Sequence, residues 1–169
     1  EPAVDAAGAA RGAEVLILMV VNAAQAEQVL FDDGALQALD EGGIVCLMAT
    51  CPPAAVERIA ARVTASKRRF VDAPVSGGTA GATAASLTIM AACDRATFDA
   101  MQPVFQAMGQ RIFHVGERAG QGATVKTVNQ LLCGVHIAVV AEAFALAAKV
   151  GVSLDVLLDI MGGSAASSW

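Results

Sequence analysis

The chain of 169 residues is apolar and sparsely charged: 56% of its residues are hydrophobic, 16% are charged, and the net charge is −5. Such a composition excludes a disordered chain, and the length fits one domain or a domain plus part of another. Aromatic residues make up only 4%, tyrosine is absent, and the longest basic run is residues 67–69. A nucleic-acid partner is therefore not expected.

Four cysteines lie scattered in apolar or strand-like stretches: Cys46, Cys51, Cys93 and Cys133. No pair has C-x-x-C spacing, and neither histidine has ligand-like spacing to them, so we expect no metal site. Free thiols are typical of a reducing compartment. The first residues also lack the basic start and apolar core of a signal peptide. The sequence therefore predicts a cytoplasmic protein.

Short apolar runs alternate with helical patterns over the first two thirds of the chain. The predicted strands are 15–21, 44–48, 69–73, 87–92 and 111–115, and the predicted helices are 24–31, 54–64 and 96–108. The first two runs are continuously apolar, which is typical of strands buried on both faces. Asp94 is suited to cap the helix at 96–108, and Gly109 is suited to end it. Strands alternating with helices predict an α/β doubly wound sheet.

The pattern changes after Gly122, where a long apolar helix is predicted over 123–150. Gly151 ends this helix, and Ser153 caps a further one that runs to Met161. A mixed α/β region is therefore followed by an all-helical region.

Residues 131–150 are long enough to cross a membrane. His136 and Glu142 fall in the middle of this stretch, and an acidic residue at the bilayer centre costs about 2.5–3.5 kcal/mol. We therefore expect this helix to be buried in a large core or a subunit interface, and we expect no membrane partner.

Two glycine-containing segments carry the polar residues of most interest: Asp72–Gly78 (DAPVSGG) and 116–130 (GERAGQGATVKTVNQ). In the second segment, Lys126 lies just inside the long helix and Asn129 follows one turn later. A lysine there must find a partner, reach water along its own stem or have a function, because burying an unpaired ammonium is costly. Together the two segments indicate an enzyme.

Three motifs resemble the 3-hydroxyisobutyrate (β-hydroxyacid) dehydrogenase family in order and separation: Asp72–Gly78, residues 113–116 (FHVG) and Gly120–Asn129. The run VVNAAQAEQVLF at 20–31 is most similar to the L-threonate dehydrogenase branch. The resemblance implies an oxidoreductase that transfers a hydride between NAD or NADP and a small hydroxy acid. A homo-oligomer is expected on a different ground, the apolar surface of the 123–150 helix.

Members of that family begin with a strand and a G-x-G-x-x-G turn, but no strand predicted here is followed by such a turn. The resemblance therefore implies a fragment with a partial Rossmann-type sheet. Residues 1–119 are then the latter part of a dinucleotide-binding domain, and residues 120–169 are the start of a helical substrate and dimerisation domain. The alternative is a catalytically inactive structural or oligomerising module, because the 123–150 helix alone exposes a large apolar patch.

By this resemblance, Lys126 is the catalytic residue that accepts or donates the proton of the substrate hydroxyl. The structural alternative is a lysine that snorkels near a helix end. Asn129 lies three residues further on, hence on the same helix face, and is assigned to the substrate. A buried amide contact is its alternative.

Ser76, Gly77 and Gly78 follow a strand and a proline turn, where successive backbone N–H groups suit a substrate carboxylate. The family resemblance assigns them to the substrate, and an ordinary tight turn is the alternative. Asp72 is expected to shape this turn.

Asn22 and Thr50 follow the first two predicted strands, at the carboxyl ends where open α/β sheets bind ligands. By resemblance, Asn22 lies near the cofactor ribose and Thr50 near the nicotinamide, although Leu47 and Ala49 replace the usual Asp and Ser. The structural alternatives are a strand-terminating turn for Asn22 and a helix cap for Thr50.

Overall fold

The apolar runs form a six-stranded sheet in the computed structural model, which describes residues 2–167. The strands are β1 (Val15–Leu18), β2 (Ile44–Leu47), β3 (Arg69–Asp72), β4 (Val75–Ser76), β5 (Leu87–Ala92) and β6 (Gly109–Gly116). Their order is β1-β2-β3-β5-β4. β6 lies off this order and pairs with β5. β1, β2 and β3 are mutually parallel, whereas β5 runs antiparallel to β3 and parallel to β6.

Nine helical segments complete the described part of the chain. They are α1 (Ala6–Ala10), α2 (Ala23–Glu27), the π-helical η1 (Gln28–Asp32), α3 (Ala35–Ala38), α4 (Pro53–Ala65), α5 (Gly78–Thr83), α6 (Arg95–Met108), α7 (Gln121–Lys149) and α8 (Leu154–Gly162). The chain divides into two compact units, one ending at Thr127 and one beginning at Val128. The prediction of an α/β sheet followed by a helical region is confirmed.

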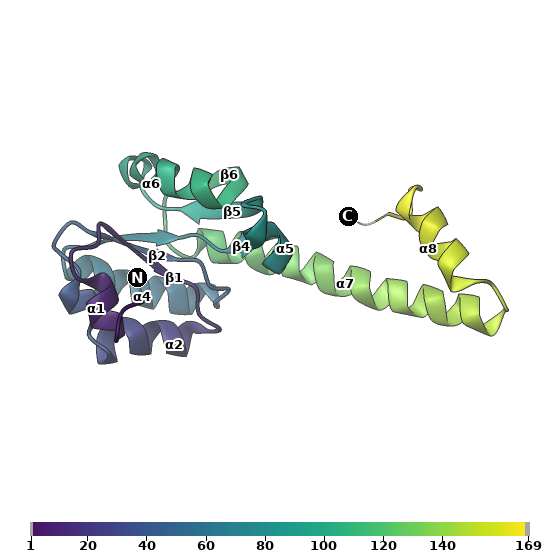
Figure 1. Cartoon of the computed structure of the whole chain (residues 1–169), viewed down its shortest axis with the longest axis horizontal. Helices are drawn as coiled ribbons and strands as arrows, with labels where there is room; N and C mark the ends of the chain where they lie inside the picture. Colours follow the sequence, from purple (N-terminus) through teal and green to yellow (C-terminus); the bar gives the residue numbers. More distant parts are fainter. Residues whose placement is uncertain (1, 168–169) are drawn as a thin grey trace. The chain divides into compact units, whose positions relative to one another are not determined.

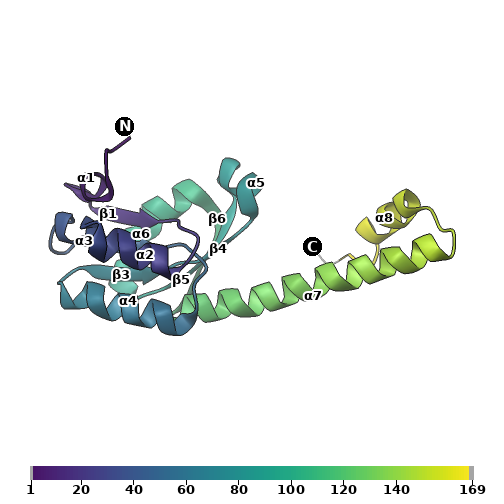
Figure 2. The same ribbon diagram turned by 90° about the horizontal axis from the view of Figure 1, so that it is seen from below.

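Two hydrophobic cores cover the two faces of the sheet. Val45 and Leu47 of β2 pack in one core with residues of α2, η1, α3 and α4, and Ile44 and Cys46 pack in the other core with residues of α6. Successive side chains of a strand point to opposite faces, so this fully apolar strand contributes to both cores. Figure 1 shows α2 and α4 on one side of the strands and α6 on the other, and Figure 2 shows α2 and α4 from their own side.

The strand predicted at 15–21 is shorter than expected and is not buried on both faces. β1 ends at Leu18, and the side chains of Met19 and Val21 are 60% and 79% exposed. Within β1, Leu16 and Leu18 are buried but Ile17 is 38% exposed. The reason is that α6 packs mainly on β3, β5 and β6, so on this face of β1 its core reaches only Val15.

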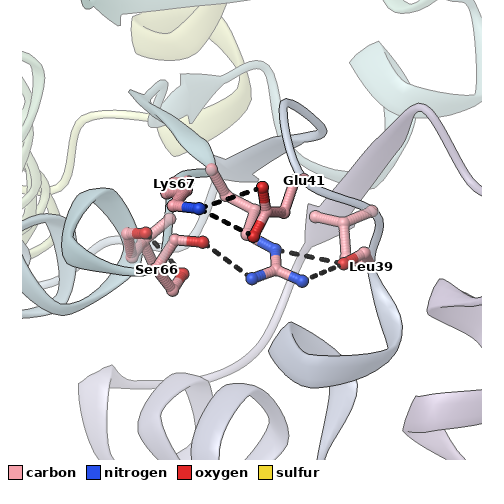
Figure 3. Close-up of polar contacts among 6 residues, drawn as sticks. Leu39, Glu41, Ser66 and Lys67 are labelled. Atoms are coloured by element: carbon pink, nitrogen blue, oxygen red, sulfur yellow. Dashed lines mark hydrogen bonds and ion pairs between the residues drawn. The ribbon is translucent and has the colours of Figure 1, made fainter.

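A group of polar contacts ties together the loops at the amino ends of β2 and β3 (Figure 3). Lys67 forms an ion pair with Glu41 at 3.3 Å, and the guanidinium of Arg68 donates to the carbonyls of Leu39 and Ser66. These residues lie at the opposite end of the parallel strands from Asn22, Thr50 and Asp72. One end of the sheet is therefore braced by side chains, while the predicted ligand-binding residues gather at the other.

The second unit holds most of α7 and all of α8. Gly151 adopts a left-handed φ of 80° after α7, and Ser153 caps α8 through the N–H of Val156, as predicted. α7 is long and apolar enough to cross a membrane by length and composition alone. Only 6% of its most apolar window is buried in this structure, so the described residues do not themselves cover the helix, and burial in a larger core stays a prediction. A subunit interface remains a prediction.

Candidate functional site

The carboxyl ends of the parallel strands lead directly into the predicted cofactor residues. Asn22 is exposed and caps α2, because its Oδ1 accepts a hydrogen bond from the N–H of Gln25 at 3.0 Å. Thr50 is also exposed, two residues before the N-cap of α4. That N-cap is Pro52, which makes no side-chain bond to the helix. The alternative of Thr50 as a helix cap is therefore wrong, because the chain turns into the helix only after Pro52.

Asp72, the last residue of β3, is the acidic residue around which the site is built. Its side chain is 1% exposed, and its Oδ2 accepts hydrogen bonds from the N–H groups of Gly120 at 2.9 Å and Ala123 at 3.0 Å. Burial raises the pKa of this carboxyl, although the backbone N–H groups of Ala123, Gly120 and Gly122 act in the opposite direction. We expected Asp72 to shape its own turn, but it binds the start of α7 instead.

Close backbone contact holds the first turn of α7 against the sheet. A Cβ on Gly122 would lie 2.6 Å from the carbonyl oxygen of Met90 and 2.7 Å from that of Asp72. Real Cβ atoms essentially never approach another heavy atom so closely, so only glycine fits here. The face of α7 that carries Gly122 therefore contacts the ends of β3 and β5.

Lys126 is buried on the same helix face. Its side chain is 6% exposed, and it lies four residues after Gly122, the spacing that brings two positions onto one side of a helix. Lys126 therefore lies one helical turn after Gly122, the glycine that contacts the sheet. The burial does not fit the alternative of a lysine that snorkels to water, while the catalytic role of Lys126 remains a prediction.

The turn predicted to bind a carboxylate starts four residues after Asp72. Ser76 belongs to the short strand β4 and pairs with Thr88 of β5, so it is not a simple turn residue. Gly77 and Gly78 both have positive φ, 129° and 60°, and α5 begins at Gly78 with no side-chain cap. Both values favour glycine, most strongly the 129° of Gly77, where a Cβ would also lie 3.2 Å from Leu87.

One residue of β5 contacts both segments of the predicted site. The N–H of Met90 donates to the carbonyl of Pro74 at 3.0 Å, and its own carbonyl lies against Gly122. The DAPVSGG loop and the start of α7 are therefore joined at Met90 as well as at Asp72. Asn129, in contrast, is exposed and belongs to the second unit.

A hollow of about 560 Å³ lies beside the start of α7. It is lined by Glu57, Arg118, Ala119, Gly120, Gln121 and Thr124. None of the predicted site residues is among them, so this hollow does not correspond to the predicted site.

Sequence reasoning missed the contact between Asp72 and α7. The sequence did offer one signal, an acidic residue at the end of an apolar strand, because a carboxylate buried there needs hydrogen-bond donors. Its donors lie 48 and 51 residues away in the chain, so the pairing is visible only in the fold.

Comparison with known proteins gives matches over nearly all of the chain. A family model described as the NAD binding domain of 6-phosphogluconate dehydrogenase matches residues 1–116. A second, described as NAD-binding of NADP-dependent 3-hydroxyisobutyrate dehydrogenase, matches residues 120–169.

Individual relatives agree with these models. The chain is 42% identical to an L-threonate dehydrogenase of Haemophilus influenzae over 92% of its own length and 52% of the relative. It is 40% identical to the Escherichia coli K12 L-threonate dehydrogenase over 98% of its length and 55% of the relative. A crystal structure of 3-hydroxyisobutyrate dehydrogenase from Salmonella typhimurium superimposes with a TM-score of 0.91 at 41% identity, covering 98% of this chain and 57% of that one. The chain thus spans about half the length of these relatives.

Proposed function

Because this chain belongs to the family of NAD(P)-dependent 3-hydroxyacid dehydrogenases, we propose that it carries the catalytic lysine and the substrate-binding turn of an enzyme that oxidises a small hydroxy acid. The cofactor is NAD or NADP. The proposal concerns the complete enzyme, since the chain spans about half the length of its curated relatives.

The chemistry needs a group that handles the hydroxyl proton. A bound NAD or NADP would supply the acceptor for the hydride of the carbon that carries the hydroxyl. The O–H bond must break as the carbonyl forms, and the amine of Lys126 takes that proton. In the reverse direction the ammonium of Lys126 returns the proton to the carbonyl oxygen.

The other site residues orient the substrate. The backbone N–H groups of Ser76, Gly77 and Gly78 bind its carboxylate, and the positive φ angles of the two glycines support this role because they allow successive N–H groups to converge. Asn129 hydrogen-bonds the substrate hydroxyl. Substrate orientation of this kind brings the reacting carbon and oxygen into place before proton transfer.

The cofactor residues fit a nicotinamide nucleotide in their chemistry. Asn22 uses its side-chain oxygen to cap α2, which leaves the amide NH₂ as a donor, and Thr50 offers an exposed hydroxyl. Such groups suit ribose hydroxyls and the nicotinamide carboxamide, and both residues follow parallel strands at their carboxyl ends. No G-x-G-x-x-G turn follows a strand among residues 2–167, so the pyrophosphate is not assigned to this chain.

The observation that carries this proposal is the burial of Lys126 one turn after Gly122, the residue whose backbone contacts the carbonyls of Met90 and Asp72. We expect Lys126→Ala in the complete enzyme to lower kcat by about 10²–10⁴-fold, the usual contribution of a general acid–base group, with cofactor affinity unchanged. Steady-state rates and a fluorescence titration of NADH measure the two effects.

The matched control is Lys149→Ala, which removes an exposed lysine at the far end of the same helix and should leave kcat unchanged. A Lys126→Ala enzyme that turns over at a normal rate would refute the catalytic role.

For the substrate, we propose a sugar acid such as L-threonate. The 40–42% identity to L-threonate dehydrogenases of two species supports this choice over other hydroxy acids. A rate screen of small hydroxy acids with NAD⁺ and with NADP⁺ tests it, and a clear preference for another acid would contradict it.

The four cysteines are all unpaired, which supports a cytoplasmic location.

A second candidate function is that of a structural or oligomerising module, catalytically inactive by itself. The exposed apolar side chains of α7 favour it. Homo-oligomerisation through α7 is compatible with both candidates. Titration of this chain with NAD⁺ separates them, because tight binding contradicts the inactive module.

A further inference from the structure

Buried charge in this protein is concentrated at one place. Among residues 2–167, only three polar or charged side chains are buried: Asp72, Thr97 and Lys126. Thr97 is explained by its hydrogen bonds to Asp94 at the start of α6. Two buried ionisable residues remain. Lys126 belongs to the first turns of α7, and Asp72 accepts a hydrogen bond from the first turn of that helix.

Asp72 acts as a helix cap that comes from another strand. A helix start leaves several N–H groups without a partner, and usually the side chain just before the helix accepts from one of them. The residue before α7 is Gly120, which has no side chain and has a φ of 91°. The carboxylate of Asp72 replaces the missing cap by accepting from the N–H groups of Gly120 and Ala123.

The same contact fixes the first turn of α7 against the sheet. A Cβ on Gly122 would meet the carbonyl oxygens of Met90 and Asp72, so this turn cannot move closer to the sheet, and the two hydrogen bonds to Asp72 oppose its moving away. Lys126 follows one turn later on the face of Gly122. A displacement of the first turn therefore moves the lysine by a similar distance.

We propose that Asp72 is a positioning residue: by capping α7 from the end of β3 it determines where the amine of Lys126 lies relative to the DAPVSGG loop. This inference rests on the proposed function of Lys126. It assigns Asp72 no contact with the substrate, and it makes the acidic residue of DAPVSGG the link between that loop and the lysine.

The first experiment compares Asp72→Ala with Asp72→Asn in the complete enzyme. Asp72→Ala removes the acceptor, and we expect kcat to fall about 10²-fold, the effect of a misplacement near 1 Å, with little change in the KM for NAD⁺. Asp72→Asn keeps an oxygen acceptor and should recover at least a tenth of the normal kcat. A merely structural role predicts a lower Tm but a normal kcat per folded enzyme.

The second experiment uses two glycines of α7. Gly122→Ala introduces a Cβ that must push the first turn away from Met90 and Asp72, so it should lower kcat as Asp72→Ala does, without altering the carboxylate. Gly134→Ala is the matched control, since a Cβ there has no neighbour within 4 Å, and its kcat should be unchanged. This pair decides the question if Asp72→Ala does not fold.

The third measurement does not depend on catalysis. Amide hydrogen exchange at 120–127 should accelerate at least tenfold in Asp72→Ala of this chain and stay slow in Asp72→Asn. If Lys126→Ala keeps full activity, the proposed function fails. The exchange measurement still tests whether Asp72 caps α7, because it does not depend on activity. Unchanged exchange in Asp72→Ala, or a normal kcat in both Asp72→Ala and Gly122→Ala, overturns the inference.

Discussion

At the scale of single residues, three of the four thiols are shielded by the fold. Cys46, Cys51 and Cys93 are each at most 3% exposed, whereas Cys133 in α7 is partly exposed. Burial raises the pKa of all three buried thiols, that of Cys93 to about 12, and the charge of Asp72 adds to the effect on Cys46 and Cys51. The thiolate is the reactive form, so these residues behave as core side chains.

We therefore expect iodoacetamide at pH 8 to modify Cys133 well before the other three. A thiol of pKa about 12 is ionised in only roughly one molecule in ten thousand at this pH. Peptide mass mapping over time follows each site, and addition of urea should expose all four. Equal rates of modification of Cys93 and Cys133 in the folded protein would contradict this.

The raised pKa values also predict a pH dependence of stability. The thiols ionise at lower pH in the unfolded chain than in the folded one, so the free energy of unfolding should decline above about pH 8.5.

At the scale of elements, α6 and α7 are capped in different ways. α6 is capped locally: Asp94 accepts from the N–H of Thr97 at 2.9 Å and from its hydroxyl at 2.7 Å. These bonds, first the hydroxyl and then the N–H, lower the pKa of Asp94. α7 is capped by Asp72 from a different strand. The local cap stabilises its helix alone, while the distant cap also joins two parts of the site.

We expect Asp94→Ala to lower the free energy of unfolding by about 1 kcal/mol at pH 7, the usual value of an N-cap. Because the folded-state pKa of Asp94 lies below the unfolded one, this stabilisation is complete above about pH 4 and is lost as the pH falls through the folded-state value. Urea titrations at pH 7 and pH 3 measure the difference. Asp99→Ala is the control, since its exposed ion pair with Arg95 contributes less; an equal cost for both variants would refute the cap.

At the scale of the whole molecule, the second unit exposes most of its apolar side chains. They include Val128, Leu131, Leu132, Val135, Ile137, Val139 and Leu146, which are 48–65% exposed along α7. Isolated exposed apolar residues are common, but a continuous set on one helix is typical of an interaction surface. The first unit, in contrast, buries its apolar residues in two cores.

We therefore expect this chain to self-associate, and we expect Leu131→Lys with Val135→Lys to shift it towards the monomer by replacing two side chains that are 65% and 48% exposed. Sedimentation equilibrium over a range of concentrations measures the shift. The control is Gln106→Lys with Gln110→Lys, which adds the same charge at exposed positions outside α7. A chain that sediments as a monomer throughout contradicts the prediction.

Local signals in the sequence predicted five of the six described strands, the long helices and the caps at Asp94 and Ser153, although the first strand was predicted too long and β4 was missed. Each of these depends on residues within about four positions, through hydrogen bonds and side-chain periodicity that any chain with this sequence can form. The sequence singled out Lys126 as a residue that needs a partner, a route to water or a function, but it did not decide among them; its burial came from the fold. The roles of the site residues remain predictions.

Only the tertiary structure decided the antiparallel pairing of β5 with β3, the exposure of Ile17, and the contact of Asp72 with Gly120 and Ala123. Each depends on groups far apart in the chain. Asp72 finds its donors only because β3 ends where α7 begins, and Ile17 is exposed only because α6 covers other strands. A sequence pattern records which side chain needs a partner, whereas the path of the backbone determines which partner it meets.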